Sequence, residues 1–352
     1  MSTQNALLVT ELGKPLTATS TWPLHQPKPN QLLLRVTLTG LNPHDHYGRD
    51  YGLFIKDTLP TPLGADIVGI VHAVGSEVTK FKVGDHAFTY GNMFEPGHAQ
   101  NGLQQYAISD EAYTAKVPEG YSDHEVATIP VNFSAAYITL YDEESGLGLP
   151  IPGSSKAESV DLASETILII GGGSNCGKFL VQLAGISGFG KIVVLGGNEE
   201  ELKKYGATTV LDRHGGYEAV RARIQAAVGD NLLYAVDAVN TPDGQYVGIN
   251  ALSSSGHGKL SRLRPSAPHD TTNVTREPGT YQVINTTGIP QLRSVGKKQW
   301  EHITEYLEAR KIFPLKYAIA DGVGLNADAV NEVLDRYRDG KPVVQTHFRI
   351  SN

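Results

Sequence analysis

The sequence predicts a mixed α/β protein with two domains, one mostly β-sheet and one built on a doubly wound parallel sheet. Three observations support this prediction. The chain has 352 residues, which is more than one domain usually holds. Residues 5–116 contain short β-like runs separated by turns rich in proline, glycine and asparagine. From residue 165 onward, apolar strand-like runs alternate with segments of helical period, as crossover connections between parallel strands require.

The β-rich part contains clear strand candidates at residues 31–41, 65–75 and 85–90. After them, residues 123–144 carry apolar side chains three and four apart, which predicts a helix with one buried face. Residues 145–165 are rich in glycine, proline and serine, so we expect a surface loop there.

The alternating part gives one candidate element after another. The expected strands are 165–170, 191–197, 208–212, 231–240 and 280–288. The expected helices are 178–188, 199–207 and 217–229, with one more helix and strand within 244–263. A polar segment lies at 265–280, and two amphipathic helices and a strand close the chain at 299–312, 328–340 and 343–350. We therefore assign residues 1–130 and 296–352 to the β-rich domain and 131–295 to the parallel-sheet domain.

Charge and cysteine usage exclude several classes of function. The chain has 30 basic and 37 acidic residues, a formal charge of −7, which argues against a broad surface for nucleic acid. Its one cysteine, Cys176, rules out an internal disulfide framework and a cysteine-based structural zinc site. The first residues lack a leader-like pattern, and no apolar stretch approaches the roughly 18 residues that span a bilayer. We therefore expect a cytoplasmic protein without a membrane segment.

The stretch ETILIIGGGSNCGKFLVQLA, residues 165–184, has the order of a dinucleotide-binding turn, with a strand, then glycines, then a helix. Small residues let the backbone turn tightly and approach phosphate oxygens, while amides at the start of the helix face the anion. A tight turn without a ligand is the alternative interpretation, and Cys176 is expected to be a packing residue rather than a nucleophile. The predicted cofactor-binding residues here are Gly171, Gly172, Gly173, Ser174, Asn175, Cys176 and Gly177.

The end of the next strand bears on the choice of cofactor, because an acidic residue there would bind the adenosine ribose of NAD. The tip carries no carboxylate that would repel a 2′-phosphate, and consists of Gly196, Gly197 and Asn198. Lys203 or its neighbour Lys204 is a candidate to hold that phosphate. Glu199 to Glu201 crowd the same turn, where acidic residues also complement a helix dipole. NADPH is therefore predicted in preference to NADH.

Stretches spread over essentially the whole chain resemble the medium-chain dehydrogenase/reductase superfamily. They are LTGLNPHDHYGRDYG, TPLGADIVGIVHAVGSEVTKFKVGDHAF, NGLQQYAI, KVPEGYSDHEVATIP, IIGGGSNCGKFLVQLA, KKYGATTVLDR and GKPVVQTHFRI. The resemblance implies a GroES-like domain on the substrate side and a Rossmann-like domain that carries NAD(P)H. In detail, GLNPHDHYGRDYGLF and the glycine loop are most similar to fungal cipB-like oxidoreductases and to trans-acting enoyl reductases of polyketide assembly.

The sequence departs from the alcohol dehydrogenases of that superfamily at the zinc ligands. Those enzymes carry a cysteine and a Gly-His-Glu motif where this chain has GLNPHD and Gly64-Ala65-Asp66. His44, Asp45 and His46 are adjacent in sequence and cannot all converge on one ion. We therefore expect no zinc and no other metal, as in the quinone oxidoreductase and enoyl reductase branches.

The resemblance also implies which side chains act. Asn42 occupies the position of the zinc-ligating cysteine and is expected to point toward the nicotinamide. Tyr47 and Tyr51 are candidates to donate a hydrogen bond or proton, with packing as the alternative for each. Residues matching stretches that usually line the cofactor are Asn132, Asn240, Thr286, Thr287 and Gln345. Asp66 and Asp85 are expected to cap turns of the β-rich domain.

These features favour an NADPH-dependent, zinc-independent reductase of an activated C=C bond or a quinone, acting on a small hydrophobic substrate. The basic run at 262–276 leaves open an acyl carrier partner with a carrier-bound substrate. The alternatives are a carbonyl reductase of the alcohol dehydrogenase type and a relative that binds NADP(H) without net reduction, as a sensor, a scaffold or a catalyst of cyclisation. The chain is expected to be a monomer or a homodimer.

Overall fold

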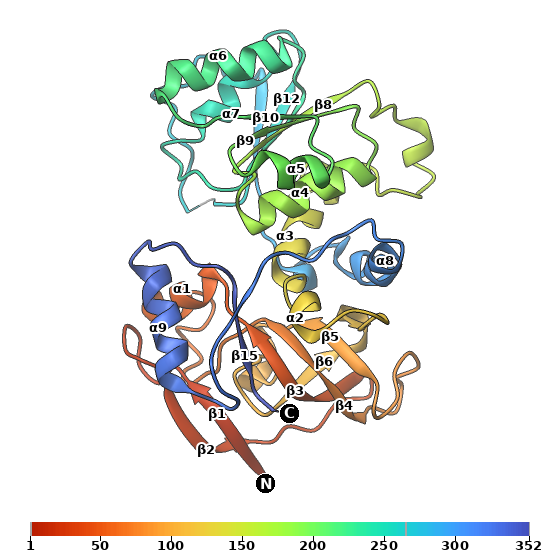
Figure 1. The fold of residues 1–352 in the computed structure, drawn as a ribbon, viewed down its shortest axis with the longest axis vertical. Coiled ribbons are helices and arrows are strands. Elements are labelled where there is room, and N and C mark those ends of the chain that lie inside the picture. Colours follow the sequence, from red (N-terminus) through yellow and green to blue (C-terminus); the bar gives the residue numbers. More distant parts are fainter. Residues whose placement is uncertain (1, 265, 352) are drawn as a thin grey trace. The chain divides into compact units, whose positions relative to one another are not determined.

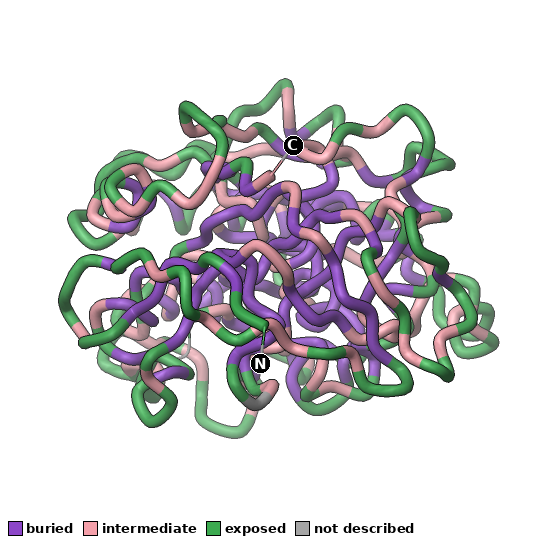
Figure 2. Tube along the Cα trace, turned by 90° about the horizontal axis from the view of Figure 1, so that it is seen from below, coloured by how far each residue is buried: buried purple, intermediate pink, exposed green. Residues whose placement is uncertain are grey.

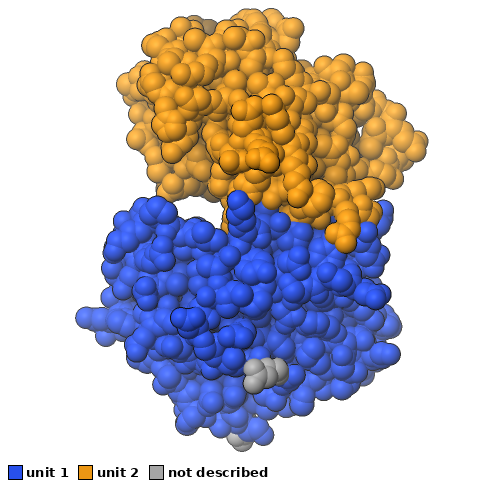
Figure 3. Space-filling model, viewed as in Figure 1, with its two compact units in different colours: residues 1–131, 300–308, 314–352 blue, residues 132–299, 309–313 orange. Residues whose placement is uncertain are grey.

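The computed structural model describes residues 2–264 and 266–351, and the chain folds into two compact units. Unit 1 consists of residues 1–131, 300–308 and 314–352, and unit 2 of residues 132–299 and 309–313 (Figure 3). The predicted domain boundaries at residues 130/131 and 295/296 state which parts of the chain fold and function separately. They stay a prediction.

Unit 1 is built on a mostly antiparallel sheet in which β14, β15, β3, β4, β5 and β7 lie side by side and β6 pairs with β3 (Figure 1). The C-terminal strand pairs antiparallel with β3, which holds the end of the chain in the same unit as its beginning. A separate ribbon is formed by β1 and β2. The strands are β1 Thr3–Leu8, β2 Thr17–Pro23, β3 Gln31–Gly40, β4 Asp66–Val74, β5 His86–Tyr90, β6 Tyr106–Asp110, β7 Thr114–Lys116, β14 Ala318–Ile319 and β15 Thr346–Arg349.

The helices of unit 1 include one that the sequence analysis missed, α1 over Pro43–Tyr51. It packs against α9, Ala327–Arg338, where Arg49 forms an ion pair of 2.7 Å with Asp335. The helix expected over residues 123–144 is two helices, α2 Asp123–Val126 and α3 Pro130–Tyr141, because a proline favours an extended conformation in the residue before it. Short 3₁₀ turns lie at Pro96–His98 and Glu111–Tyr113.

Unit 2 contains a parallel sheet of six strands in the order β10, β9, β8, β11, β12, β13. In chain order this is 3-2-1-4-5-6, the arrangement of a doubly wound dinucleotide-binding fold. The strands are β8 Thr166–Ile170, β9 Lys191–Leu195, β10 Thr209–Leu211, β11 Tyr234–Asp237, β12 Gly258–Arg262 and β13 Tyr281–Asn285. The predicted fold class, a β-rich domain plus a doubly wound parallel-sheet domain, is confirmed.

Helices cover both faces of the parallel sheet (Figure 1). On one face, α6 and α7 pack on alternate strand residues such as Leu168 and Ile170. Ile167 and Ile169 alternate with these residues, point to the other face, on the side of α4, and are also fully buried. The helices of unit 2 are α4 Asn175–Ile186, α5 Glu199–Lys204, α6 Gly216–Val228 and α7 Tyr246–Ala251, with 3₁₀ turns at Ala157–Ser159 and Pro290–Leu292. Helix α8, Gly296–Glu308, begins in unit 2, and its residues 300–308 belong to unit 1.

Burial follows this layering, with buried segments inside and exposed loops at the surface (Figure 2). In unit 1 the main apolar cluster joins β3, β4 and α9 through residues such as Leu34, Ile67 and Leu334. Within the described residues, no helix has both the length and the apolar character needed to cross a bilayer.

Candidate functional site

Most of the predicted cofactor-binding residues lie at one edge of the parallel sheet of unit 2. Ile170 is in register with Leu195 on one side and with Asp237 on the other, so the segments that follow these residues leave the sheet at the same edge. In doubly wound folds this carboxyl edge is where ligands bind. The glycine loop follows β8, Gly196 follows β9, Asn240 follows β11, and Thr286 follows β13.

Three glycines of the loop have no room for a side chain. Gly171 has a φ of +91°, and a Cβ there would lie 2.5 Å from Val239 Cγ1. A Cβ on Gly172 would lie 2.2 Å from Val194 Cγ1, and one on Gly177 2.2 Å from the Gly171 carbonyl oxygen. The backbone can therefore approach a ligand more closely here than it could with any larger residue.

The helix after the loop begins with a capped first turn. The Ser174 hydroxyl accepts a hydrogen bond from the Gly177 N–H at 3.0 Å and donates one to the Gly171 carbonyl at 2.8 Å. The loop is thereby tied to the N-terminus of α4, whose partial positive charge favours a phosphate. Cys176 lies in this turn, and its thiol donates to Asn132 Oδ1 at 3.4 Å. Its packing role and its assignment to the cofactor both stay predictions.

The tip of β9 packs directly against the glycine loop. Gly197 has a φ of +106°, and a Cβ there would lie 2.8 Å from the Gly173 nitrogen and 2.6 Å from Leu202 Cδ1. Two glycine segments that are distant in sequence thus form one continuous backbone surface. Next to it, Lys178 of α4 and Glu201 of α5 form an ion pair of 3.0 Å between largely buried side chains.

The side chains predicted to hold a 2′-phosphate already have other partners. Asn198 Oδ1 caps α5 by accepting from the Glu201 N–H at 2.9 Å. Lys203 is paired with Glu199 at 2.7 Å, and the Lys204 ammonium lies 5.3 Å from the centre of the Phe313 ring. The lysine contacts compete with binding of a phosphate at this turn, whereas the Asn198 cap uses only the side-chain oxygen and leaves its amide N–H groups for a phosphate.

Sequence reasoning missed Arg213, which follows β10 and places its side chain against the β9 tip. Arg213 Cδ lies 3.1 Å from the position that a Gly196 Cβ would occupy. The residue is exposed, and no carboxylate of the described chain forms an ion pair with it, in contrast to Lys203. The position of Arg213 could have been predicted, because β10 pairs in parallel with β9 and the residues that follow both strands leave the sheet at the same edge.

Other predicted residues of unit 2 make hydrogen bonds within the protein. The Asn240 amide donates to Asp237 Oδ2 at 2.8 Å, and Thr286 shares a hydrogen bond of 2.7 Å with Ser261. The Thr287 N–H donates to the Ser145 hydroxyl at 2.8 Å. These contacts support the hydrogen-bonding alternative for the three residues, and their assignment to the cofactor stays a prediction.

Unit 1 holds a buried polar network around Asp66. One carboxylate oxygen accepts from Asn42 Nδ2 at 2.6 Å and from Gln345 Nε2 at 2.7 Å, and the other accepts from the Val131 N–H at 2.8 Å. Asp66 is fully buried, and Asn42 and Gln345 are each 2% exposed. Gln345 lies in unit 1 beside Asp66, and its assignment to the cofactor stays a prediction.

Burial raises the pKa of Asp66 to about 7, although the three donors lower it, and the nearby Asp45 charge adds to the rise. Asp66 has the structural role expected of it and accepts one backbone N–H, from Val131, but it begins β4 inside the sheet, a position that differs from the expected turn-capping role. It holds for Asp85, whose carboxylate accepts from the Lys82 N–H at 3.0 Å within a turn.

The donor set at this position does not fit zinc. An Asn42 amide stands where zinc-dependent members of the resembled superfamily have a thiolate, and its nitrogen is already a donor to Asp66. Ala65 offers no ligand, and zinc in proteins is bound by thiolate, imidazole or carboxylate groups. Among residues 2–264 and 266–351, no group of three or more His, Cys, Asp or Glu side chains is arranged to hold a metal ion.

The two candidate tyrosines lie on α1, and both are exposed. Tyr47 is 38% exposed and Tyr51 is 67% exposed, with their ring centres 6.0 Å apart. The His46 ring lies 4.0 Å from the Tyr47 ring, and burial lowers the pKa of His46 in spite of the Asp50 charge. Because the Asn42 amide is committed inside unit 1, the tyrosine hydroxyls are the better candidates to donate to a substrate.

Comparison with known proteins places these features in a family. Residues 28–119 match the alcohol dehydrogenase GroES-like domain. Dehydrogenase orsE of Emericella nidulans is 28% identical over 97% of both chains. Dehydrogenase mokE of Monascus pilosus is 31% identical over 76% of this chain and 72% of its own. Trans-enoyl reductase RAP2 of Pyricularia oryzae is 30% identical over 61% of this chain and 58% of its own.

Solved structures share the whole fold. A protein assigned as a zinc-dependent alcohol dehydrogenase from Rhizobium etli aligns with a TM-score of 0.79 and 18% identity over 99% of both chains. The CurK enoyl reductase aligns with a TM-score of 0.74 and 18% identity over 99% of both chains. Mycobacterial Rv1454c, solved with NADPH, aligns with a TM-score of 0.72 and 20% identity over 98% of this chain and 99% of its own. At these identities the similarity shows the fold alone.

Proposed function

This chain belongs to the medium-chain dehydrogenase/reductase superfamily, in its enoyl-reductase-like branch, and from that we propose that it is an NADPH-dependent, zinc-independent reductase. Its substrate on this proposal is a small hydrophobic molecule with an activated C=C bond, as in an enone or enoyl thioester, or a quinone. The name of the relative RAP2, a trans-enoyl reductase, supports the first of these classes.

The observation that carries the proposal is the backbone surface formed by the two glycine segments. Gly172 and Gly173 lie against Gly196 and Gly197, next to the N-terminus of α4. A Cβ on Gly171, Gly172 or Gly197 would lie less than 3.0 Å from a neighbouring atom, so these positions exclude a side chain. These residues fit the pyrophosphate of a dinucleotide, which needs close backbone approach and a helix N-terminus. Arg213, exposed at the same tip, supports NADPH rather than NADH, because a guanidinium binds a 2′-phosphate well.

Bound NADPH would supply a hydride to the substrate. The protein then has to stabilise the negative charge that develops on the substrate oxygen and to deliver a proton. Addition to the β-carbon of an enone, or to a quinone, spreads that charge into an enolate or phenolate, for which a hydrogen-bond donor is sufficient. We assign the donor role to the exposed Tyr47 hydroxyl. The Asn42 amide is not assigned this role, because its N–H group already donates to Asp66.

The test is a stopped-flow screen of NADPH and NADH oxidation against enones, enoyl thioesters, quinones and aldehydes, with metal analysis of the same sample. We expect NADPH-dependent reduction of at least one enone, enoyl thioester or quinone by metal-depleted enzyme. Activity on aldehydes that a chelator removes and Zn²⁺ restores would instead identify the alcohol dehydrogenase chemistry. Substrate consumption without NADPH oxidation would identify the non-redox alternative.

A further inference from the structure

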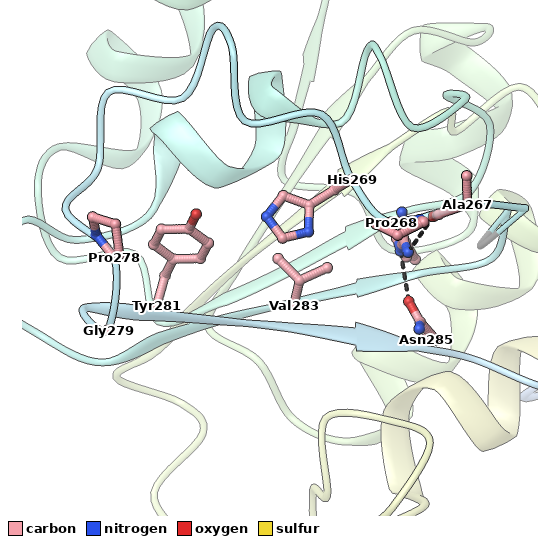
Figure 4. Close-up of a pocket in the computed structure, with 9 residues that line it drawn as sticks. Ala267, Pro268, His269, Pro278, Gly279, Tyr281, Val283 and Asn285 are labelled. Carbon is pink, nitrogen blue, oxygen red and sulfur yellow. Dashed lines mark hydrogen bonds between the residues drawn. The ribbon is translucent and has the colours of Figure 1, made fainter.

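A cavity of about 570 Å³ lies in unit 2 beside the edge strand β13, under the polar segment that joins β12 to β13. Tyr281, Val283 and Asn285, alternate residues of β13, form one wall. Figure 4 shows the His269 ring above Val283, between Tyr281 and Pro268. Two residues of the basic run at 262–276, Arg262 and His269, line this cavity.

Arg262 is a buried cation without a carboxylate partner. It is 2% exposed, and its guanidinium donates to Asn285 Oδ1 at 2.6 Å, Gln245 Oε1 at 2.6 Å and the Ala267 carbonyl at 2.7 Å. All three acceptors are neutral, and no carboxylate within the described chain forms an ion pair with Arg262. Because a guanidinium has five N–H groups, two remain after these hydrogen bonds. A buried charge without a counter-ion is costly, since its hydration is lost without an opposite charge in return.

The other polar groups of the cavity are also suited to an anion. Asn285 uses its oxygen for Arg262, so only the N–H groups of its amide remain for a ligand. His269 Nε2 is shielded from solvent and has no hydrogen-bond partner among the described residues. Burial lowers the pKa of His269, and the Arg262 charge lowers it further. The described residues that line the cavity include no aspartate or glutamate.

The other basic residues of the run are engaged elsewhere. Arg264 donates to the Val239 carbonyl at 3.0 Å, and the Arg276 guanidinium forms an ion pair of 3.5 Å with the Asp230 carboxylate. The run is therefore not a diffuse basic surface. It presents one buried guanidinium and one imidazole to one cavity, whose walls also include the apolar side chains of Tyr281 and Val283.

We propose that this cavity binds the phosphate group of an organic phosphate, with Arg262, Asn285 and His269 as donors and Tyr281 and Val283 in contact with the ligand's apolar part. A guanidinium fork beside further N–H donors matches the geometry of phosphate oxygens. Such a phosphate can belong to a free metabolite or to a phosphopantetheine arm. The site is separate from the glycine loop and does not depend on the proposed reductase activity.

The experiment follows the imidazole NMR signals of the full-length protein during titration, with the His269 signal assigned from its loss in His269→Gln. The ligands are inorganic phosphate and phosphopantetheine, with sodium chloride at matched ionic strength as the blank. Because phosphate can also bind at the glycine loop, each titration is repeated with NADPH present. We expect a saturable shift of the His269 signal with both phosphates, and tighter binding of phosphopantetheine if a carrier arm is the source.

The decisive variant is Asn285→Asp, which keeps an oxygen for the Arg262 Nε hydrogen bond and adds the missing counter-ion. We expect it to raise the thermal midpoint and to weaken phosphate binding at least about tenfold, as loss of a charge-assisted contact implies. Arg264→Gln is the control, since it removes a nearby positive charge outside the cavity, and its binding should match the wild type. The proposal is overturned if the His269 signal responds to phosphate no more than to chloride, or if Asn285→Asp binds phosphate as tightly as the wild type.

Discussion

Replacing Asp66 with asparagine tests the buried network of unit 1 through the pH dependence of stability. The ordinary pKa of 3.8 and the native value of about 7 lie roughly three pH units apart. At about 1.36 kcal/mol per pH unit, titration of this carboxyl group lowers the free energy of unfolding of the wild type by about 4 kcal/mol between pH 4 and pH 7. The asparagine variant lacks this dependence because its side chain does not titrate.

The sign follows from proton binding. Between pH 3.8 and about 7 the native state keeps a proton that the unfolded state has released, so the free energy of unfolding decreases as pH rises. His347 has the opposite effect, because burial, together with the His124 charge, lowers its pKa to about 3. Both residues are present in the wild type, so the useful quantity is the difference between wild type and Asp66→Asn, in which His347 cancels.

The assay is urea unfolding of both proteins between pH 5 and pH 8. The stability of the wild type relative to the variant should fall with pH up to about 7 and level off above it. Asp85→Asn is the control. Burial alone would raise the pKa of Asp85, but the Lys116 ammonium at 2.9 Å and the Lys82 N–H outweigh it and lower that pKa. Its difference curve should be flat in this range. A flat curve for Asp66→Asn, or one that rises with pH, would refute the reasoning.

Three further substitutions test the cofactor and substrate assignments. Gly197→Ala should weaken NADPH binding about tenfold or more in fluorescence titration, because the new Cβ meets Gly173 and Leu202. Gly188→Ala is the control and should not weaken binding, because Gly188 is also at positive φ but nothing lies within 4 Å of its Cβ position. Arg213→Gln should weaken NADPH binding about tenfold and leave NADH binding unchanged; Lys203→Gln should have little effect on either, since Lys203 is paired with Glu199. An equal loss for both cofactors in Arg213→Gln would contradict this assignment. Tyr47→Phe should lower kcat about a hundredfold and leave cofactor affinity unchanged. An unaltered kcat, or an equal loss of kcat in Tyr51→Phe, would show that Tyr47 is not the specific donor.

The features that the sequence predicted are those encoded locally. The strand, glycine loop and start of α4 occupy twenty consecutive residues, and the alternation of strands and helices in unit 2 is visible as a change of period. The helix α1 was missed because it is only nine residues long and buries polar residues such as Asp45 and Arg49, so it lacks an apolar stripe. Its start was marked by Asn42 and Pro43, a capping residue followed by proline at the first helical position.

The buried network could not be predicted because its members are far apart in sequence. Asp66 meets Asn42, Val131 and Gln345, which lie 24, 65 and 279 residues away. The environment of Arg262 depends in the same way on contacts with Gln245, Ala267 and Asn285 across two strands and a loop. The position of Arg213, by contrast, could have been predicted, because the residues that follow neighbouring parallel strands lie at the same edge of the sheet.

The proposed hydride transfer from NADPH to an activated carbon, without zinc, can be followed by isotope labelling. Metal-depleted enzyme would be given NADPH deuterated at the transferring position of the nicotinamide, together with the best substrate of the stopped-flow screen. For an enone or enoyl thioester, the account predicts deuterium at the β-carbon of the product, formed at the same rate before and after metal removal. For these two substrate classes, deuterium on a carbinol carbon or product without deuterium would contradict it, as would turnover of any substrate only after Zn²⁺ is restored.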